Sequence, residues 1–123
     1  MSDQKSAYSQ ASEYYVEAAT GPEAVNQDAY NKSKERERKH GENWNKQKVN
    51  LNEICDEFAP GDMGEIRGQK FIFEGDRYVV QADMAAGYLR IWDKDLKSHV
   101  RLDKTPSSKE TETHFKIKRR EEM

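Results

Sequence analysis

The sequence predicts an α+β protein in which N-terminal helices pack on a four- to five-stranded antiparallel sheet. Two observations lead to this fold class. Up to residue 58 the apolar residues recur near helical spacing, whereas from Gly68 onward they alternate with a period of two. Short runs of turn-forming residues then separate the alternating stretches, which is typical of an antiparallel meander.

The chain divides into a polar segment, residues 1–48, and a second part, residues 49–123. Of its 123 residues 34% are hydrophobic and 36% are charged, so we expect one compact domain with a looser extension. In the polar segment, residues 12–19 have helical composition, and a second helix is expected after Pro22. Trp44 is the large apolar residue that can anchor this segment.

A mixed-charge run, residues 32–40, continues the second helix until Gly41. The run is either a phosphate-binding arm or the solvated side of a helix, which is the commoner use of such a pattern. The next helix is expected over residues 49–58, where Asn50 or Asn52 is suited to the N-cap position.

Cys55 is the single cysteine, and it falls on the apolar side of the helix expected over residues 49–58. This position indicates a buried structural thiol. One cysteine excludes an internal disulfide framework and a multi-cysteine metal site. No apolar run approaches the length of a membrane span and no signal peptide begins the chain, so we expect a soluble protein or fragment in a reducing compartment.

Five strands are expected after Gly68. The first two are joined across Glu74-Gly75-Asp76 in a tight hairpin connection. The polar stretch 104–112 precedes the last strand. The expected strands are residues 70–74, 77–83, 87–93, 98–103 and 113–118.

Alternation assigns the side chains of the last three strands to two faces. One face is apolar and would lie against the helices: Leu89, Ile91, Val100, Leu102, Phe115 and Ile117. The opposite face has no Asp or Glu at its alternating positions, whereas solvated sheet faces usually mix acids with bases. It is therefore either an active face or a basic solvated one. Its members are Tyr88, Arg90, Trp92, His99, Arg101, His114, Lys116 and Lys118.

The chemistry that suits this face is metal-free cleavage of RNA, in which the ribose 2′-hydroxyl attacks its own phosphodiester. The reaction needs a base, an acid and cations that stabilise charge on the phosphoryl oxygens. The expected catalytic residues are His114, Arg90, His99, Lys116 and Thr113, although Thr113 has the simpler role of beginning the strand. The expected substrate-binding residues are Arg101, Tyr88, Trp92, Lys118 and Arg77.

No metal or cofactor is expected. The three histidines lack the spacing of a zinc motif, and no phosphate loop or dinucleotide fingerprint is present. Asp83 and Asp93 could form a divalent-metal site, but carboxylates at these positions more often end strands and shape turns. The net charge is −2, yet residues 65–123 hold 13 Lys and Arg against 11 Asp and Glu, so basic residues would gather in the second part.

Residues 49–123 resemble the C-terminal toxin domains of bacterial polymorphic toxin and contact-dependent growth inhibition systems. The stretches that carry the resemblance are residues 76–78 (Asp-Arg-Tyr), 82–91 (Ala-Asp-Met-Ala-Ala-Gly-Tyr-Leu-Arg-Ile), 113–117 (Thr-His-Phe-Lys-Ile) and 119–123 (Arg-Arg-Glu-Glu-Met). The resemblance implies a ribonuclease of the barnase/EndoU/colicin/RelE-like type, with an antiparallel sheet and a metal-free active face.

The same resemblance implies tRNA or rRNA as the substrate and a cognate immunity protein as the partner. It also implies delivery from the producing bacterium into the cytoplasm of the target cell, with residues 1–48 similar to the variable cell-entry segment of such toxins. Neither DNA nor a membrane span is expected. The alternative is a non-catalytic RNA- or protein-binding module, such as an immunity-type inhibitor.

Overall fold

The computed structural model describes residues 6–12, 24–68 and 70–123, and it confirms the α+β fold class. The strands of this part of the chain form one mixed, open sheet in the order β1-β7-β5-β4-β3-β2, and β6 pairs with β5 beside this path. They are β1 (Asn45–Val49), β2 (Glu65–Arg67), β3 (Lys70–Glu74), β4 (Tyr78–Asp83), β5 (Tyr88–Asp93), β6 (Ser98–His99) and β7 (Phe115–Ile117).

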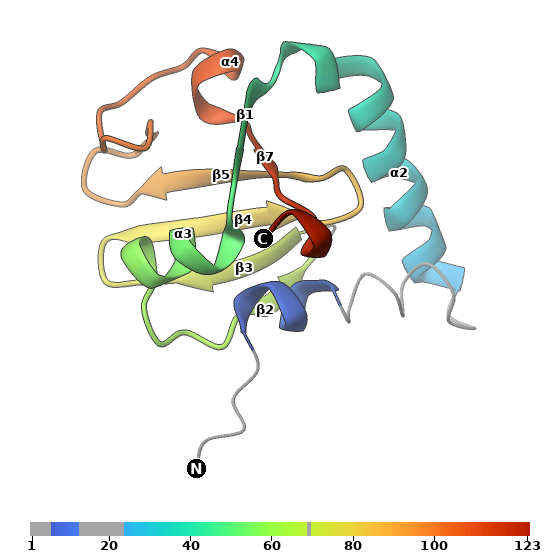
Figure 1. Ribbon diagram of the computed structural model, residues 1–123, viewed down its shortest axis with the longest axis horizontal. Coiled ribbons are helices and arrows are strands. Elements are labelled where there is room, and N and C mark those ends of the chain that lie inside the picture. The colour runs from blue at the N-terminus through green and yellow to red at the C-terminus, as the bar shows by residue number, and fades with distance from the viewer. Residues whose placement is uncertain (1–5, 13–23, 69) are drawn as a thin grey trace.

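The helices are arranged on different sides of this sheet (Figure 1). Helix α3 lies across β3 and β4, whereas α2 runs along one side of the sheet. Residues 7–12 are also helical, and beyond residue 12 the helix expected over residues 12–19 lies outside the described residues. The bounds are α2 (Ala24–His40), α3 (Leu51–Phe58) and α4 (Glu110–Thr113), with 3₁₀ turns η1 (Gly41–Asn43) and η2 (Arg120–Glu122).

The expectation of a purely antiparallel sheet of four to five strands is wrong, because β1 and β2 also belong to the sheet. Strand β1 runs parallel to β7, with Asn45 opposite Phe115 and Val49 opposite Ile117. The sequence of β1, Asn-Lys-Gln-Lys-Val, buries only Val49, so it carries no alternating apolar signal. All three residues of the edge strand β2 are exposed.

Helix α3 forms where the sequence predicts it. The Asn50 side chain accepts hydrogen bonds from the backbone N–H groups of Asn52 and Glu53, which satisfies donors that the first turn of a helix leaves free. Its apolar side is buried: Leu51, Ile54, Cys55 and Phe58. Burial raises the pKa of the Cys55 thiol to about 12, so this residue is a structural thiol, as predicted.

The main core lies between α3, residues 7–12 and one face of the sheet. The expected apolar face contributes to it through Leu89, Ile91, Val100, Phe115 and Ile117, which are all buried. Leu102 is the exception, because it is 38% exposed. Regular pairing of β6 ends at His99, and the chain turns between Arg101 and Thr105 instead of continuing as a strand.

A second, smaller cluster anchors the N-terminal part of the chain on the opposite face. Trp44 is 2% exposed and packs with Ala86 and Tyr88, which confirms its expected role as an anchor. From α2, the Ser33 hydroxyl donates a hydrogen bond to Asp83 Oδ2 (3.0 Å) and Arg36 forms an ion pair with the same oxygen (2.9 Å). These contacts fix α2 beside the turn between β4 and β5.

Most of the mixed-charge run of α2 is exposed. Lys34 pairs with Glu37 at 2.9 Å, and Arg38 pairs with Glu35. Within the described residues, no helix combines the length and the apolar composition that crossing a bilayer requires.

Candidate functional site

A cleft of about 450 Å³ opens on the sheet face opposite α3, and it is bounded by α2, α4 and the strands β3 and β5. We call it the His114 cleft. Lys70, Tyr88 and Arg90 reach it because alternation directs them away from the main core. The residues that line it are Lys32, Glu35, Arg36, Lys39, His40, Trp44, Lys70, Tyr88, Arg90, Glu110 and His114.

Positive charge dominates the lining of the His114 cleft, since five lysines and arginines face two glutamates. Arg36 forms an ion pair with Asp83, and Lys39 forms one with Glu35 at 3.6 Å. Lys70 and Arg90, by contrast, have no carboxylate within ion-pair distance in the described part of the chain. Two cations without a counter-ion in a cleft are suited to binding an anion.

Both of these cations are partly withdrawn from water. Burial lowers the pKa of Lys70, and the neighbouring Arg36 and Arg90 lower it further. Burial also lowers the pKa of Arg90. The Arg90 Nε atom is buried and has no hydrogen-bond partner in the described part of the chain, so one donor of this guanidinium is unsatisfied.

Arg90 is held in place by His99 rather than by an acid. Its Nη2 atom lies 2.8 Å from His99 Nδ1, and His99 Nε2 lies 2.9 Å from Gln81 Oε1. An arginine can only donate, so Nδ1 must accept and the Nε2–H group must donate to the amide oxygen of Gln81. His99 is therefore neutral: burial and then the positive Arg90 lower its pKa to about 4. His99 does not line the His114 cleft.

His114 lies against two aromatic rings. The centroid of its imidazole is 5.2 Å from that of Tyr88 and 6.1 Å from that of Trp44, with interplanar angles of 30° and 12°. The Trp44 indole N–H donates a hydrogen bond to Glu110 Oε1 at 3.0 Å, which ties α4 to this stack. The two aromatic rings thus hold the His114 imidazole in place, and His114 also lines the cleft.

The hydrogen bonds of Thr113 decide which nitrogen of His114 carries the proton. Thr113 is buried, and its hydroxyl donates to the carbonyl oxygen of Lys109 at 3.0 Å. The same hydroxyl lies 3.3 Å from His114 Nδ1. Because a hydroxyl has one proton to give, these two contacts together assign the His114 proton to Nδ1, which leaves the lone pair on Nε2.

The charge state of His114 follows from its surroundings. Burial lowers its pKa most, and the positive charge of Arg90 adds to this, so that the pKa falls to about 4. At neutral pH the imidazole is therefore uncharged. An unprotonated Nε2 is the starting state of a general base, and here it belongs to a cleft that also holds two cations, Lys70 and Arg90, without a carboxylate partner among the described residues.

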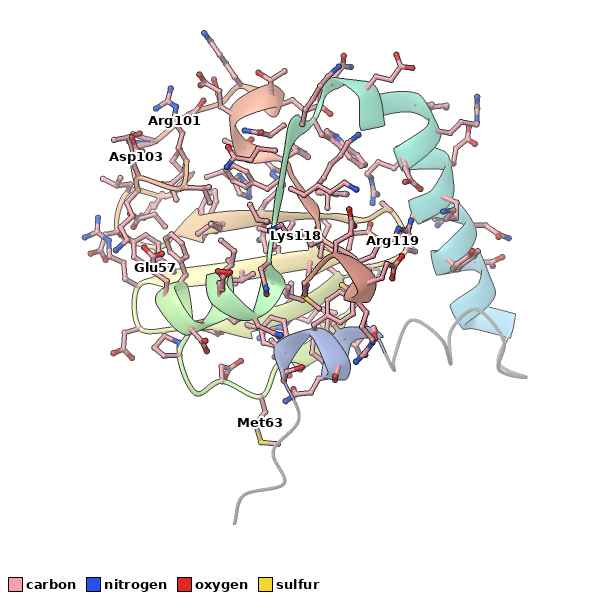
Figure 2. The ribbon with its side chains drawn as sticks, in the orientation of Figure 1. Glu57, Met63, Arg101, Asp103, Lys118 and Arg119 are labelled. Atoms are coloured by element: carbon pink, nitrogen blue, oxygen red, sulfur yellow. The ribbon has the colours of Figure 1, made fainter. Side chains whose placement is uncertain are left out.

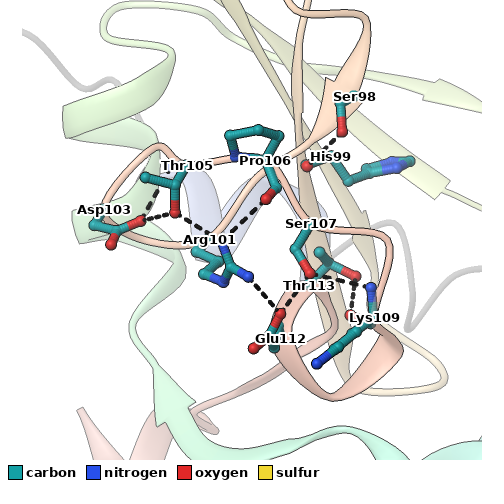
Figure 3. A network of polar contacts seen from close by, with 10 residues as sticks. All are labelled: Ser98, His99, Arg101, Asp103, Thr105, Pro106, Ser107, Lys109, Glu112 and Thr113. Carbon is teal, nitrogen blue, oxygen red and sulfur yellow. Dashed lines mark hydrogen bonds and ion pairs between the residues drawn. The ribbon is translucent and has the colours of Figure 1, made fainter.

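Arg101 does not line the His114 cleft. Its guanidinium donates to Thr105 Oγ1, to the Pro106 carbonyl and to Glu112 Oε1, and these bonds hold together the loop that precedes α4 (Figure 3). Figure 2 shows Arg101 beside Asp103 on the side of the molecule away from α2. The structure therefore gives Arg101 a place in a loop network and does not bring it to the cleft.

The remaining candidates are dispersed around the cleft. Lys116 lies opposite Tyr88 in the sheet, but it lines a neighbouring hollow together with Lys118. Trp92 packs edge-on against His99 at 4.9 Å. The buried Tyr88 lines the cleft, but its ring already packs on Trp44 and His114.

Arg77 forms an ion pair with Asp93 at 2.9 Å, at the far ends of β4 and β5. Asp93 also accepts the backbone N–H groups of Asp95 and Leu96, and Asp83 accepts that of Ala86. Both aspartates thus end strands and shape the following turns, which was the commoner interpretation of their positions. Among the described residues no three histidine, cysteine or acidic side chains are grouped as a metal site would need.

Sequence reasoning did not place Lys70 or Glu110 at the site, and it considered His40 only as part of a possible phosphate-binding arm, residues 32–40. Lys70 had a detectable signal. It is two residues from Ile72 and so lies on the same face of β3, and Ile72 pairs with Gln81, which in turn pairs with Arg90. His40 and Glu110 come from a helix end and from a stretch predicted to be a loop, and no local pattern places them beside a sheet.

Comparisons with known proteins identify no relative. No family model matches the chain, and the searches of curated proteins and of solved structures also gave no match.

Proposed function

We propose that this protein is a metal-independent endoribonuclease whose active site is the His114 cleft. The observation that carries the proposal is the neutral His114, with its free Nε2 lone pair, beside Lys70 and Arg90, which have no carboxylate partner in the described chain. A base next to unneutralised cations suits a substrate that brings both an acidic hydroxyl and a phosphate, and RNA has both on neighbouring atoms.

In the proposed reaction, His114 Nε2 accepts the proton of the ribose 2′-hydroxyl, and the 2′-oxygen attacks the adjacent phosphorus. Arg90 and Lys70 bind the non-bridging phosphoryl oxygens and stabilise the charge that develops on them. A bond forms between phosphorus and the 2′-oxygen and the bond to the 5′-oxygen breaks, which leaves a 2′,3′-cyclic phosphate and a free 5′-hydroxyl.

The leaving 5′-oxygen needs a proton. His40 is the other histidine that lines the cleft, at the exposed end of α2, and we assign it this role. His99 and Thr113 then act as positioning residues. His99 accepts a hydrogen bond from Arg90, and Thr113 fixes the tautomer of His114.

A purified-enzyme assay tests this assignment. The wild-type chain, incubated with labelled RNA in EDTA, should give fragments that end in 2′,3′-cyclic phosphate, and RNA with 2′-deoxyribose at the cleaved position should stay intact. His114→Ala should lower the cleavage rate by about 10²- to 10⁴-fold, the usual contribution of a general base. Intact RNA with the folded wild type would refute the proposal.

A matched pair of arginine variants separates the cleft from the wider basic face. Arg90→Gln should abolish most of the cleavage, because it removes a cation from the cleft. Arg101→Gln should keep it, since Arg101 is held in the loop before α4. Both variants must first show a wild-type circular dichroism spectrum. Equal loss of activity in the two folded variants would contradict the placement of the site in the His114 cleft.

For the biological setting we propose what the resemblance implies: the protein is a toxin that cleaves tRNA or rRNA in the target-cell cytoplasm and is neutralised by an immunity protein. Inducible expression in bacteria tests it, with His114→Ala beside the wild type. Growth arrest with discrete RNA fragments, both lost in the variant, is the expected outcome. Normal growth with intact RNA would exclude the toxin.

A second candidate function is a non-catalytic binding module, including an immunity-type inhibitor. The observation that favours it is a hollow between α3 and the β3–β4 turn that combines four carboxylates with one arginine: Glu57, Asp62, Glu74, Asp76 and Arg77. Glu57 and Glu74 are paired with Lys104 and Lys94, so among the described residues the uncompensated negative charge comes from Asp62 and Asp76. Such charge is complementary to a basic nuclease. Tight binding of a nuclease together with failure to cleave RNA would select this function over the first.

A further inference from the structure

A second hollow, of about 240 Å³, adjoins the His114 cleft. We call it the Lys116 groove. It lies between β1, β7, α2 and the turn from β4 to β5, and Figure 2 shows two of its residues, Lys118 and Arg119, where the chain leaves β7. Trp44 lines both hollows, so the Lys116 groove and the His114 cleft meet at this side chain.

The lining of the Lys116 groove is also positive. Lys48, Lys116, Lys118 and Arg119 contribute four cations, and Glu37 is the one acid among the lining residues. Glu37 is already paired with Lys34 at 2.9 Å, and Lys48 is paired with Glu122 at 2.6 Å. The charge of the groove is therefore not balanced from within.

Lys116 and Lys118 are the informative members of the groove. Both are half-buried, and neither has a carboxylate within ion-pair distance in the part of the chain that the structure describes. The aliphatic stems of both lysines can pack against the groove while their ammonium groups remain at its surface. Two neighbouring ammonium groups without a carboxylate partner are suited to binding an anionic ligand. Their alternation with the buried Phe115 and Ile117 on β7 directs both toward the same side of the strand.

We propose that the Lys116 groove is an extended subsite of the His114 cleft and binds the phosphates of single-stranded RNA adjacent to the one being cleaved. The proposal rests on the proposed function and names its substrate class: a single strand several nucleotides long, not a dinucleotide. RNA follows the positive path past Trp44 and avoids the acidic hollow beside α3, because like charges repel there.

The test compares the affinities of a short and a long RNA. The probes are a dinucleotide and an octanucleotide, both 2′-O-methylated so that they cannot be cleaved, and binding is followed by fluorescence anisotropy from low to high salt. The test variant is Lys116→Gln with Lys118→Gln. The control is Lys97→Gln with Lys109→Gln, which removes the same charge from two exposed lysines outside both hollows.

The two lost phosphate contacts should lower the slope of log K against log salt by about 1.4 for the octanucleotide. The Lys116/Lys118 variant should then bind the octanucleotide about 25-fold more weakly than the control at 0.1 M salt, and the two should converge near 1 M salt. Dinucleotide binding should be the same for both. Equal octanucleotide affinity of the test and control variants would overturn the subsite.

The same experiment distinguishes this failure from failure of the proposed function. If wild-type protein cleaves RNA but the test variant still binds the octanucleotide like the control, the active site stands and the subsite is refuted. If the wild type binds neither probe and leaves RNA intact, both are refuted. A loss of dinucleotide affinity in the test variant would also refute the subsite, because it would place Lys116 and Lys118 at the cleaved phosphate.

Discussion

Mild acid should destabilise the fold through two half-buried imidazoles. His99 and His114 each have a pKa of about 4 in the folded protein, against an ordinary value of 6.5. The unfolded chain therefore binds more protons than the folded one as the pH falls from about 6.5 toward about 4, and stability must fall with it. The stabilising contribution is fully present above pH 6.5.

The size of the effect follows from the two pKa values. For a fully shielded imidazole, this shift corresponds to about 1.9 kcal/mol of unfolding free energy lost between pH 7 and pH 5. His99 and His114 are half-buried, so solvent screening reduces the loss to about 1 kcal/mol each, or about 2 kcal/mol together. Acidic side chains contribute little in this window, because at pH 5 they remain largely ionised in both states.

Urea unfolding followed by circular dichroism at pH 7 and at pH 5 measures this difference. His99→Gln and His114→Gln should each remove about half of the pH dependence, and the double variant should remove nearly all of it. Glutamine at position 99 can still accept from Arg90, so that variant should remain folded. A wild type equally stable at both pH values, or a double variant that keeps the full slope, would refute the buried, neutral state of these two histidines.

Three further predictions concern the fold. The Cys55 thiol should resist alkylation in the folded protein at pH 8 and react after denaturation, because burial raises its pKa to about 12; rapid alkylation of the folded chain would contradict this. Leu89→Ala should lower the unfolding free energy by about 2–5 kcal/mol, because Leu89 is fully buried. Leu96→Ala should lower it by less than about 0.5 kcal/mol, because Leu96 is 47% exposed, and similar losses for the two variants in urea titrations would be inconsistent with the core. Asp83→Ala should cost about 2–3 kcal/mol by removing the buried carboxylate that holds α2, whereas Glu35→Ala, at an exposed ion pair, should leave the urea midpoint almost unchanged; equal midpoints would show that Asp83 does not anchor the helix.

Strong local patterns made some elements predictable. The bounds of β3 are those expected, because its Lys-Phe-Ile-Phe-Glu sequence alternates and ends at a turn. Helix α3 combines an apolar side with a capping Asn50 and a following Pro60, and it too forms as expected. Strand β1 could not be found this way, because its pairing with β7 depends on tertiary contacts rather than on its own polar sequence.

The candidate site was predictable only in part, since alternation assigns a residue to a face but not to a position on that face. It correctly placed Arg90 and His114 on one side of the sheet, where they line one cleft. It also placed His99 there, but the partner that fixes this ring, Gln81, belongs to a strand outside the three considered. Arg101 does not lie on this face as predicted, because β6 ends at His99 and the chain then turns. Alternation does not reveal where a strand ends.

The most direct test of the His114 cleft as a phosphate site is the pKa of His114 measured by NMR with and without sulfate. Sulfate remains an anion over the whole titration and stands in for the phosphate. Bound near Arg90 and Lys70, it would stabilise the imidazolium form, and the pKa should rise from about 4 by about 1–3 units. Arg90→Gln should weaken the response. A His114 pKa unchanged by sulfate, at an ionic strength matched with chloride, would contradict the assignment of the cleft as the site that binds the scissile phosphate.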